Sequence, residues 1–532
     1  MDDSERHNGK GTKAASTTAP GDRLPLRTRL GYGAGDLYGG GAFFIVSTLY
    51  LIFLTDVVGI RPALAGLIVL IARGWDAVSD PLMGMISDRT RSRWGRRRPY
   101  FLVGIPFIVL SFFLLWYPAG FAAEWAKFAY ALASYLFFST VITMVMIPYN
   151  ALASELTLDY GERSRLTVFR MAFSEVSTII CALLPLMIID AAANRAAGYP
   201  LMGLIFGLFF ALPYLATFFT TWERPEFSRR TTPAELRSFL EPFRIRTFRV
   251  FILMFLFALA AMDIVLSIIV FFVTYHLGVP EITNYLLGTL LVVQLALLPA
   301  YYALSRRIGK RGAFMVGACV WAVAMGLSLL LRPGFPVWVY FVFAGLVGSG
   351  TGGVIVMAYA IFPDIPDVDE LVSGRRREGI FAGVLTFLRK LTGAFAIFLV
   401  GQAIDLAGYT SPVETIEAGV TAVAEAQQTA GFVTVLRVVF AAVPLVFIAI
   451  TMLLAARFPL SPELHARLKS YLAARREASG GDSHTATDGL AAAPEATVPT
   501  PVIDEAEERE LRRLLVTTPS TRGRRPNGRV SE

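Results

Sequence analysis

The chain has 532 residues, of which 55% are hydrophobic and only 17% are charged, and its mean hydropathy is +0.56. Soluble domains are nearer half apolar, and about a quarter of their residues are charged. A soluble chain could not bury this apolar excess. The composition therefore excludes a soluble multidomain enzyme and predicts that much of the chain faces lipid.

The few residues that usually build metal or redox sites are scattered. Cys181 and Cys319 lie inside apolar runs, and two thiols predict neither a disulfide framework nor a metal site. No buried imidazole cluster is expected, because the histidines fall in tails or at a helix end: His7, His276, His465 and His484. The net charge of +8 is typical of basic cytoplasmic loops, so no nucleic-acid partner is expected.

Twelve segments are long and apolar enough to cross a bilayer, for which about 20 residues are needed. The segment before them, 1–29, is polar and lacks the apolar stretch of a signal peptide. The sequence therefore predicts an all-α polytopic membrane protein with spans near 31–57, 63–86, 99–118, 128–153, 166–190, 199–221, 248–275, 283–304, 312–331, 336–361, 380–408 and 433–457.

Basic residues alternate sharply between the connections. The even connections hold 22 Lys and Arg, and the odd connections hold 4. Cytoplasmic loops of membrane proteins carry the excess of positive charge. We therefore expect a multi-pass protein of the cell (inner) membrane with both termini in the cytoplasm.

The longest basic connection divides the chain into two sets of six spans. Within it, Thr232-Pro233-Ala234-Glu235 has the pattern of a helix start, and Ser461-Pro462-Glu463 repeats that pattern before a helix to about Ala478. Beyond it, 479–532 is expected to be disordered. The expected parts are a polar cytoplasmic tail, a first six-helix half, a cytoplasmic linker with a short helix, a second six-helix half and a cytoplasmic tail: 1–29, 30–222, 223–247, 248–457 and 458–532.

The two halves repeat each other in their loops. SDRTRSRWGRRRP (87–99) corresponds to LSRRIGKRG (304–312), and SELTLDYGERSR (154–165) corresponds to PDIPDVDELVSGRRRE (363–378). Every cytoplasmic loop of such a protein is basic, but the shared acidic-then-basic order of the second pair favours duplication. Duplicated transporter halves hold their substrate near the midplane between them.

The second span carries Arg73, Asp76 and Asp80, although a charge at the bilayer centre costs roughly 2.5–3.5 kcal/mol. The spacing of the carboxylates places both on one helix face. Two such carboxylates repel unless a cation lies between them or one is protonated. Pro81 lacks the N–H that the Ala77 carbonyl would accept, which adds a free oxygen beside them. The alternative is that Arg73 only pairs with Asp76 and ties helices together.

Five further charges lie inside predicted spans: Arg170, Glu175, Asp263, Arg389 and Lys390. Glu175 and Asp263 could simply pair with these cations. Lys390 lies in the second half and is expected to face the carboxylate pair of the first. The chain has no phosphate-binding loop of the Walker type, so no ATP-driven step is expected.

Four segments together resemble one transporter family. They are 54–104, which includes LIARGWDAVSDPLMGMISDRTRSRWGRRRP, and YGAGD (32–36), IPYNALASELTLDYGERSRL (147–166) and PDIPDVDELVSGRRREGIFAGVLTFLRK (363–390). Their order and spacing resemble the glycoside–pentoside–hexuronide:cation symporters, a major-facilitator family typified by melibiose permease. The resemblance runs from about 30 to 460. It implies the major-facilitator fold, with two pseudo-symmetric six-helix halves.

The resemblance also implies roles for single residues. The cation-binding positions of the family fall on Asp76, Asp80 and Thr143. The solute site is expected to contain Arg170, Lys390, Tyr149 and Asn150. Three positions depart from the melibiose-type pattern. Met146 replaces a carboxylate shared by cation and sugar, Asn150 replaces a stacking tryptophan, and Gly40 replaces a sugar-binding aspartate. A galactoside is therefore disfavoured, and proton coupling gains weight over sodium coupling.

We therefore expect a monomeric, cation-coupled (H⁺ or Na⁺) symporter that moves a sugar-like or glycoside-like small solute by alternating access. The alternative is a carrier of a lysolipid-like amphiphile on the same fold. Neither enzymatic activity nor a cofactor is expected, and no metal beyond a possible Na⁺. The expected partners are the solute, the coupling cation and the lipid bilayer. Charges in two cytoplasmic loops are expected to act as gating residues: Asp88, Arg96, Asp367 and Arg376.

Overall fold

The structure, a computed structural model, describes residues 24–157, 160–223, 240–374, 377–410, 413–417, 420–424, 429–480 and 505–516. Long helices dominate these residues. We name the two ends of the helix bundle cytoplasmic and outer according to the predicted topology. The linker motif that begins at Thr232 lies outside the described residues.

The first half contains eight α-helices and one π-helix. In chain order they are α1 (Leu26–Ala34), α2 (Asp36–Ile52), η1 (Phe53–Val57, a π-helix), α3 (Pro62–Arg89), α4 (Pro99–Leu115), α5 (Glu124–Leu156), α6 (Tyr160–Asp190), α7 (Arg195–Ala211) and α8 (Pro213–Thr220). Proline opens α3, α4 and α8, where its missing N–H has no helical partner to lose.

The second half repeats this plan. It contains η4 (Glu241–Arg244), α9 (Arg246–Phe271), the π-helix η5 (Phe272–Leu277), η6 (Pro280–Ile282), α10 (Thr283–Ala296), α11 (Leu298–Ser328), α12 (Val337–Ile361), η7 (Phe362–Asp364), α13 (Ile365–Ser373), α14 (Glu378–Leu406) and α15 (Ala430–Ala456). Between α14 and α15, β1 (Val413–Glu417) pairs antiparallel with β2 (Val420–Ala424).

All twelve predicted spans coincide with helices. Among the described residues, ten helical segments are long and apolar enough to cross a membrane, and α4 is a shorter apolar helix. These eleven helices account for twelve spans because α11 belongs to two of them. It turns sharply at Gly309, where φ is 76°. Only glycine adopts this conformation readily. The part of α11 before Gly309 therefore completes the eighth span with α10, and the part after it forms the ninth.

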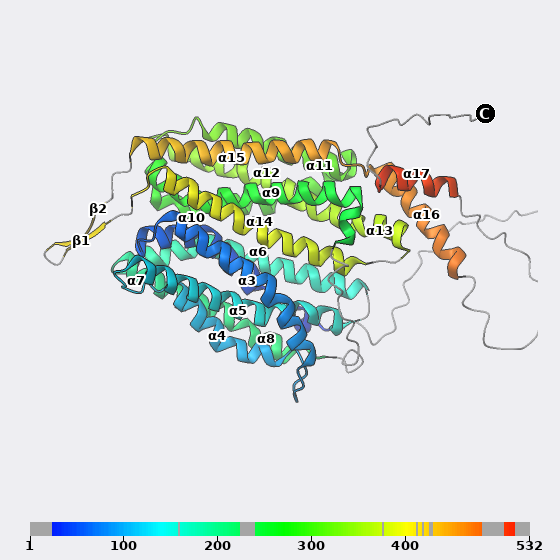
Figure 1. Ribbon diagram of the computed structural model, residues 1–532, viewed down its shortest axis with the longest axis horizontal. Coiled ribbons are helices and arrows are strands. Elements are labelled where there is room, and N and C mark those ends of the chain that lie inside the picture. Colours follow the sequence, from blue (N-terminus) through cyan, green and yellow to red (C-terminus); the bar gives the residue numbers. More distant parts are fainter. Residues whose placement is uncertain are drawn as a thin grey trace, which may run out of the picture.

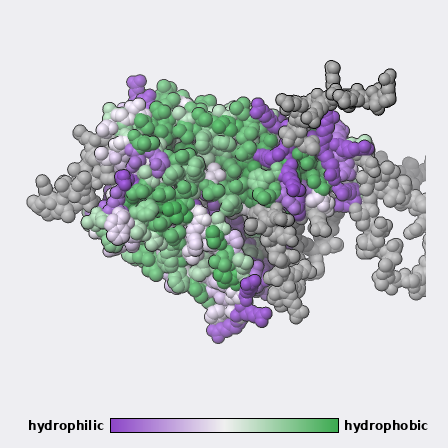
Figure 2. Space-filling model, viewed as in Figure 1, coloured by the Kyte–Doolittle hydropathy of each residue, from purple (hydrophilic) through white to green (hydrophobic). Residues whose placement is uncertain are grey.

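The two halves lie against each other along their length, and the second half is uppermost in Figure 1. Contacts between them join α3 to α14, α6 to α10 and α2 to α9. The backbones approach closely at the outer end, where a Cβ on Gly401 would lie 2.5 Å from the carbonyl oxygen of Pro62. Figure 2 shows the result from outside: apolar side chains cover the middle of the bundle, and hydrophilic ones gather at its cytoplasmic end.

The C-terminal tail contains more structure than expected. The predicted helix after Ser461 is present as α16 (Pro462–Gly480), and the Ser461 hydroxyl accepts from the N–H of Leu464. The expectation of disorder over 479–532 is wrong for α17 (Glu505–Leu515). Leu511 and Leu515 of α17 are fully buried, which supplies the stabilisation that a short charged helix lacks alone.

Candidate functional site

The predicted cation-binding residues lie together between α3 and α5. Asp76 is 1% exposed, and its Oδ1 accepts a hydrogen bond from Ser139. One turn further along both helices, Thr143 Oγ1 donates to Asp80 Oδ1 at 2.7 Å. The structure therefore brings Asp76, Asp80 and Thr143 together as predicted and adds Ser139. The spacing of Ser139 and Thr143, one turn apart on one helix face, could have indicated the second hydroxyl.

Lys390 of α14 reaches across the boundary between the halves to both carboxylates. Its Nζ lies 2.6 Å from Asp80 Oδ2 and 3.4 Å from Asp76 Oδ2. Arg73 is also present, but its Nη1 lies 3.7 Å from Asp76 Oδ2, and its guanidinium covers the ring of Phe43. The ammonium of Lys390 therefore occupies the position between two carboxylates where repulsion would otherwise be strongest.

A second polar cluster joins α2, α5 and α6 in the first half. Arg170 donates to Asn150 Oδ1 at 2.9 Å, and its Nε lies 3.5 Å from Asp36 Oδ2. Arg170 and Asn150 are thus brought together as expected, and Asp36 is an additional member. The signal for Asp36 was present in the sequence, since it is a carboxylate within the predicted first span.

Tyr149 lies beside this cluster but is fully buried. Its ring stacks on Tyr32 at 4.6 Å between centroids, and its hydroxyl donates to the Tyr32 carbonyl at 2.6 Å. A Cβ on Gly35 would lie 2.6 Å from the Tyr149 ring, so the fit is tight. In this state the hydroxyl is engaged with the backbone, and the expected contact of Tyr149 with solute stays a prediction. Its role here is to position α1 and α2.

Met146 and Gly40, the other two positions that depart from the melibiose-type pattern, both pack against neighbouring helices. The Tyr214 hydroxyl donates to the Met146 sulfur at 3.2 Å. A Cβ on Gly40 would lie 2.2 Å from Ser174 Oγ, so α2 and α6 are in close backbone contact there. A carboxylate at Gly40 would not fit this arrangement.

The second half contains an ion pair in equivalent spans. Arg389 of α14 pairs with Asp263 of α9, and Nη2 lies 2.8 Å from Oδ1. The first and fifth spans hold Asp36 and Arg170, and the seventh and eleventh hold Asp263 and Arg389. The pairing of Asp263 with a cation, which the sequence left open as an alternative, is present in the structure. Glu175 forms no comparable ion pair within the part of the chain that the structure describes.

The cytoplasmic loop after α3 is held within its own half. Arg96 Nη2 lies 2.5 Å from Glu155, and Arg97 lies 3.1 Å from Asp88. Glu223 caps the loop by accepting from the backbone N–H groups of Arg96 and Arg97 at 2.8 Å. The guanidinium groups of Arg96 and Arg97 therefore join the cytoplasmic ends of α3 and α5, and Arg98 adds α8 by donating to the Phe218 carbonyl at 2.7 Å.

The corresponding loop of the second half contacts the C-terminal tail and its own half. Asp367 lies 3.0 Å from His465 of α16, and Arg377 pairs with Asp369 at 2.6 Å. Arg376 lies outside the described residues. The expected pairing of the two loops across a closed cytoplasmic gate concerns another conformation and stays a prediction.

Comparisons with known proteins agree with this architecture. The family model of MFS/sugar transport proteins matches residues 31–462. An uncharacterized symporter of Synechocystis sp. is 28% identical over 87% of this chain and 99% of its own length. The inner membrane symporter YicJ of Escherichia coli is 28% identical, covering 82% and 92% of the two chains. The isoprimeverose transporter of Lactiplantibacillus pentosus is 26% identical, covering 73% and 82%.

Solved structures share the fold at lower identity. A bacterial homologue of the human lysosomal transporter Spinster, inward-facing and unoccupied, has a TM-score of 0.59 at 15% identity, covering 82% of this chain and 98% of its own. A bacterial homologue of ferroportin has a TM-score of 0.56, also at 15% identity, covering 82% and 100%. Together with the helix plan, these matches establish that the chain belongs to the MFS/sugar transport protein family, fits its glycoside–pentoside–hexuronide symporter branch, and is a membrane transporter and not an enzyme.

Proposed function

We propose that this protein is a proton-coupled symporter of a small, neutral, hydroxyl-rich solute, working by alternating access. The observation that carries the proposal is Lys390 between Asp76 and Asp80, because it links an ion site in one half to a solute-facing cation in the other. One relative is named as a transporter of isoprimeverose, a neutral sugar, which supports the solute class.

The charges inside the spans support one coupling cation per cycle. Away from the ends of the spans, five carboxylates (Asp36, Asp76, Asp80, Asp263 and Glu175) accompany four cations (Arg73, Arg170, Arg389 and Lys390). Charges in the membrane interior are costly unless balanced. One excess carboxylate therefore calls for one bound cation or proton. A neutral solute keeps this balance, whereas an anionic solute would upset it.

The contacts of Lys390 suggest how ion and solute binding are coupled. Without the ion, the ammonium neutralises Asp76 and Asp80. Binding of a proton at these carboxylates removes the negative charge that holds the ammonium, which then becomes free to donate to solute hydroxyls. Each ligand thereby favours the binding of the other, as reciprocal linkage requires.

The surroundings of the pair favour a proton over sodium. Sodium needs several oxygen ligands in one shell, and Met146 supplies a thioether where a carboxylate would add one. Asp76 Oδ1 already accepts from Ser139, and Thr143 already donates to Asp80. A proton needs only one carboxylate oxygen, so it is the simpler occupant.

The solute is expected to bind beside the cluster of Arg170, Asn150 and Asp36. These groups present donors and acceptors close together, at distances of 2.9 and 3.5 Å, which suits vicinal hydroxyls. Tyr149 is buried, so its ring is not available for stacking on a solute. Asn150 places an amide where the melibiose-type pattern has a stacking tryptophan. A polar, non-galactoside sugar fits this arrangement better than a solute recognised by ring stacking.

The topology underlying the proposal has both termini in the cytoplasm. Single cysteines in a cysteine-free background test it, one replacing Val420 in the loop before α15 and one replacing Glu235 in the linker. A membrane-impermeant thiol reagent applied outside intact cells should label the first and not the second. The reverse pattern would overturn the topology.

Transport in proteoliposomes tests the function. Radiolabelled sugars are screened for uptake driven by an inward pH gradient, by an inward sodium gradient, or by neither. The proposal predicts concentrative uptake of at least one neutral sugar under the pH gradient. Uptake that follows only the sodium gradient would replace the proton by sodium, and accumulation of a lysolipid in preference to every sugar would overturn the solute class.

A further inference from the structure

The ends of the first and seventh spans carry a repeated sequence that the loop comparison did not reveal. The first reads FLTDVVGI (53–60) and the second reads FVTYHLGV (272–279). Phenylalanine, threonine and glycine recur at the same places, followed by Ile60 or Val279. The two segments occupy equivalent places in the two halves.

The two segments also fold alike. Each forms a π-helix, η1 and η5, and each ends at a glycine with positive φ, 71° at Gly59 and 70° at Gly278. The next N–H closes each turn, from Ile60 to the Leu54 carbonyl and from Val279 to the Val273 carbonyl. π-Helices are rare and occur frequently at functional sites. The occurrence of a π-helix at the same place in both halves therefore indicates a functional role.

The two π-helices meet through one of the positions at which their sequences differ. That position is Asp56 in η1 and Tyr275 in η5, and the Tyr275 hydroxyl donates to Asp56 Oδ2 at 2.6 Å. Tyr409, beyond the end of α14, donates to Oδ1, as does Thr55 at 2.6 Å. Two carboxylates meeting here would repel, whereas an acid and a phenol form a charge-assisted hydrogen bond.

Aromatic packing fixes the two hydroxyls that face Asp56. The rings of Tyr275 and Tyr409 lie 5.9 Å apart, and Phe432 of α15 packs 5.4 Å from Tyr409. Phe271 lies beneath both tyrosines, at 6.2 and 5.9 Å. Asp56 therefore docks from the first half into a rigid aromatic frame built by the second.

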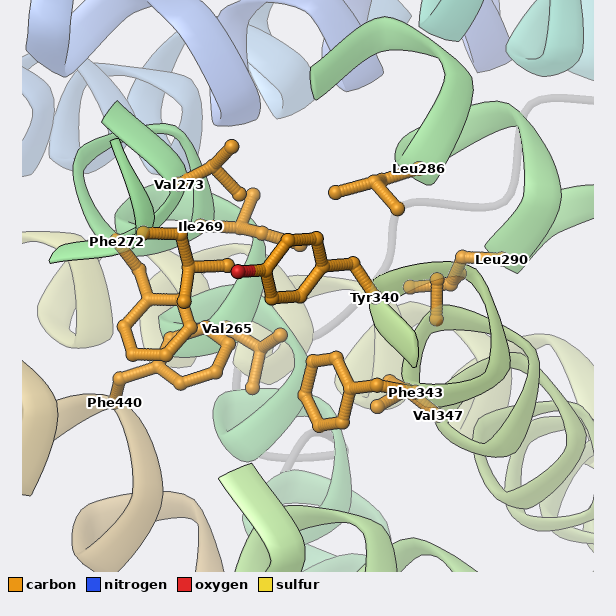
Figure 3. Close-up of a pocket in the computed structure, with 12 residues that line it drawn as sticks. Val265, Ile269, Phe272, Val273, Leu286, Leu290, Tyr340, Phe343, Val347 and Phe440 are labelled. Atoms are coloured by element: carbon orange, nitrogen blue, oxygen red, sulfur yellow. The ribbon is translucent and has the colours of Figure 1, made fainter. Parts of the chain in front are cut away.

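The opposite side of η5 faces a small cavity of about 10 Å³ lined by aliphatic and aromatic side chains. Figure 3 shows Phe272 and Val273 of η5 pointing toward it, with Phe272 against Phe440. A void of this size has room for at most about one water molecule, so it is a local packing defect beside η5.

We propose that Asp56, Tyr275 and Tyr409 form the latch that holds the outer gate closed, built from the duplicated π-helical ends. Opening the outer side separates η1 from η5 and breaks both tyrosine hydrogen bonds to Asp56. The latch acts on the conformational balance of the carrier, whichever solute or ion it transports. Its failure is therefore distinguishable from failure of the proposed coupling.

The test is a distance measurement across the outer face by double electron–electron resonance. Spin labels replace Trp125 of α5 and Trp338 of α12, which are 76% and 66% exposed, in a protein that carries Cys181→Ala and Cys319→Ser. The latch variants are Tyr275→Phe, Tyr409→Phe and their combination, which keep every ring and remove only hydroxyls. Asp190→Asn is the matched control, since it breaks the exposed outer contact between Asp190 and Arg195.

A hydrogen bond to a charged group contributes enough free energy to change the ratio of outer-open to outer-closed molecules about tenfold or more. The double variant is therefore expected to raise the ratio of long to short distances at least tenfold, with each single variant between it and wild type. Asp190→Asn should leave the ratio unchanged. An unchanged ratio in a double variant that melts like wild type would overturn the latch, and so would an equal shift in Asp190→Asn.

Discussion

Lys390 and Asp80 are separated by 310 residues in the chain, yet Nζ of one lies 2.6 Å from Oδ2 of the other. This contact joins α14 of the second half to α3 of the first at the proposed ion site. The proposed alternating-access cycle moves these two helices relative to each other. The proposal therefore predicts that this contact changes during the cycle, which makes Lys390 the best point at which to test the coupling.

Replacing Lys390 by Ala should separate the two ligands of the symporter. The cation should bind at least as tightly, because its competitor for Asp76 and Asp80 is gone, while KM for the solute should rise about tenfold with the loss of a charged donor. Uptake kinetics and ion-dependent thermal stabilisation measure the two effects. Equal loss of both affinities would mean that Lys390 is a ligand or support for both and not a competitor.

The pair of Asp263 and Arg389 should behave as a structural unit. Asp263→Asn leaves Arg389 without its carboxylate and should destabilise the protein by about 3 kcal/mol, as for other buried pairs broken on one side. Adding Arg389→Gln should restore most of the loss. Thermal unfolding in detergent measures both. If the double variant lost as much stability as the two single variants together, Asp263 and Arg389 would not act as an isolated pair.

Much of this architecture could be predicted from the sequence, because lipid imposes strong rules. A span must be long and apolar, and a charge within it is expensive, so Asp76, Asp80 and Lys390 were conspicuous. Asp56 gave no such signal. It lies at the end of a span, where a charge costs little, and its partners Tyr275 and Tyr409 are hundreds of residues away.

Other features depended on tertiary contacts that a sequence does not show. The burial of Tyr149 follows from its stacking on Tyr32. The helix α17 has a charged sequence that resembles a disordered tail, and only its docking makes it stable. Its Leu515 carbonyl accepts from the Thr247 hydroxyl, and its Leu511 is fully buried.

That docking predicts a contrast between two neighbouring leucines. Leu511→Ala removes a buried side chain and should release α17, at a cost of about 2–5 kcal/mol to the docked state. Leu514, which is 40% exposed, is the matched control. Hydrogen–deuterium exchange over residues 505–516 should rise strongly for Leu511→Ala only. Equal exchange in the two variants would show that α17 does not depend on this packing.

The same docking should weaken in acid. A hydrogen bond from the Tyr471 hydroxyl, with further help from Arg512, lowers the pKa of Glu508 below its ordinary 4.5. A group with a lowered pKa in the docked state stabilises that state at higher pH, and this stabilisation is lost as the pH falls below about 4.5. Exchange over α17 should therefore rise in that range, and less so in Tyr471→Phe. A rise confined to higher pH would assign the effect to another group.

The most direct test of the account is transport by Asp76→Asn in proteoliposomes. The variant removes the buried carboxylate of the ion site and leaves Arg170, Asn150 and Asp36 in place. Solute uptake under an inward pH gradient should stop at the external concentration, while exchange of labelled for unlabelled solute across the membrane continues. Accumulation of solute against its gradient to the wild-type level would contradict the account, because Asp76 would then have no part in coupling.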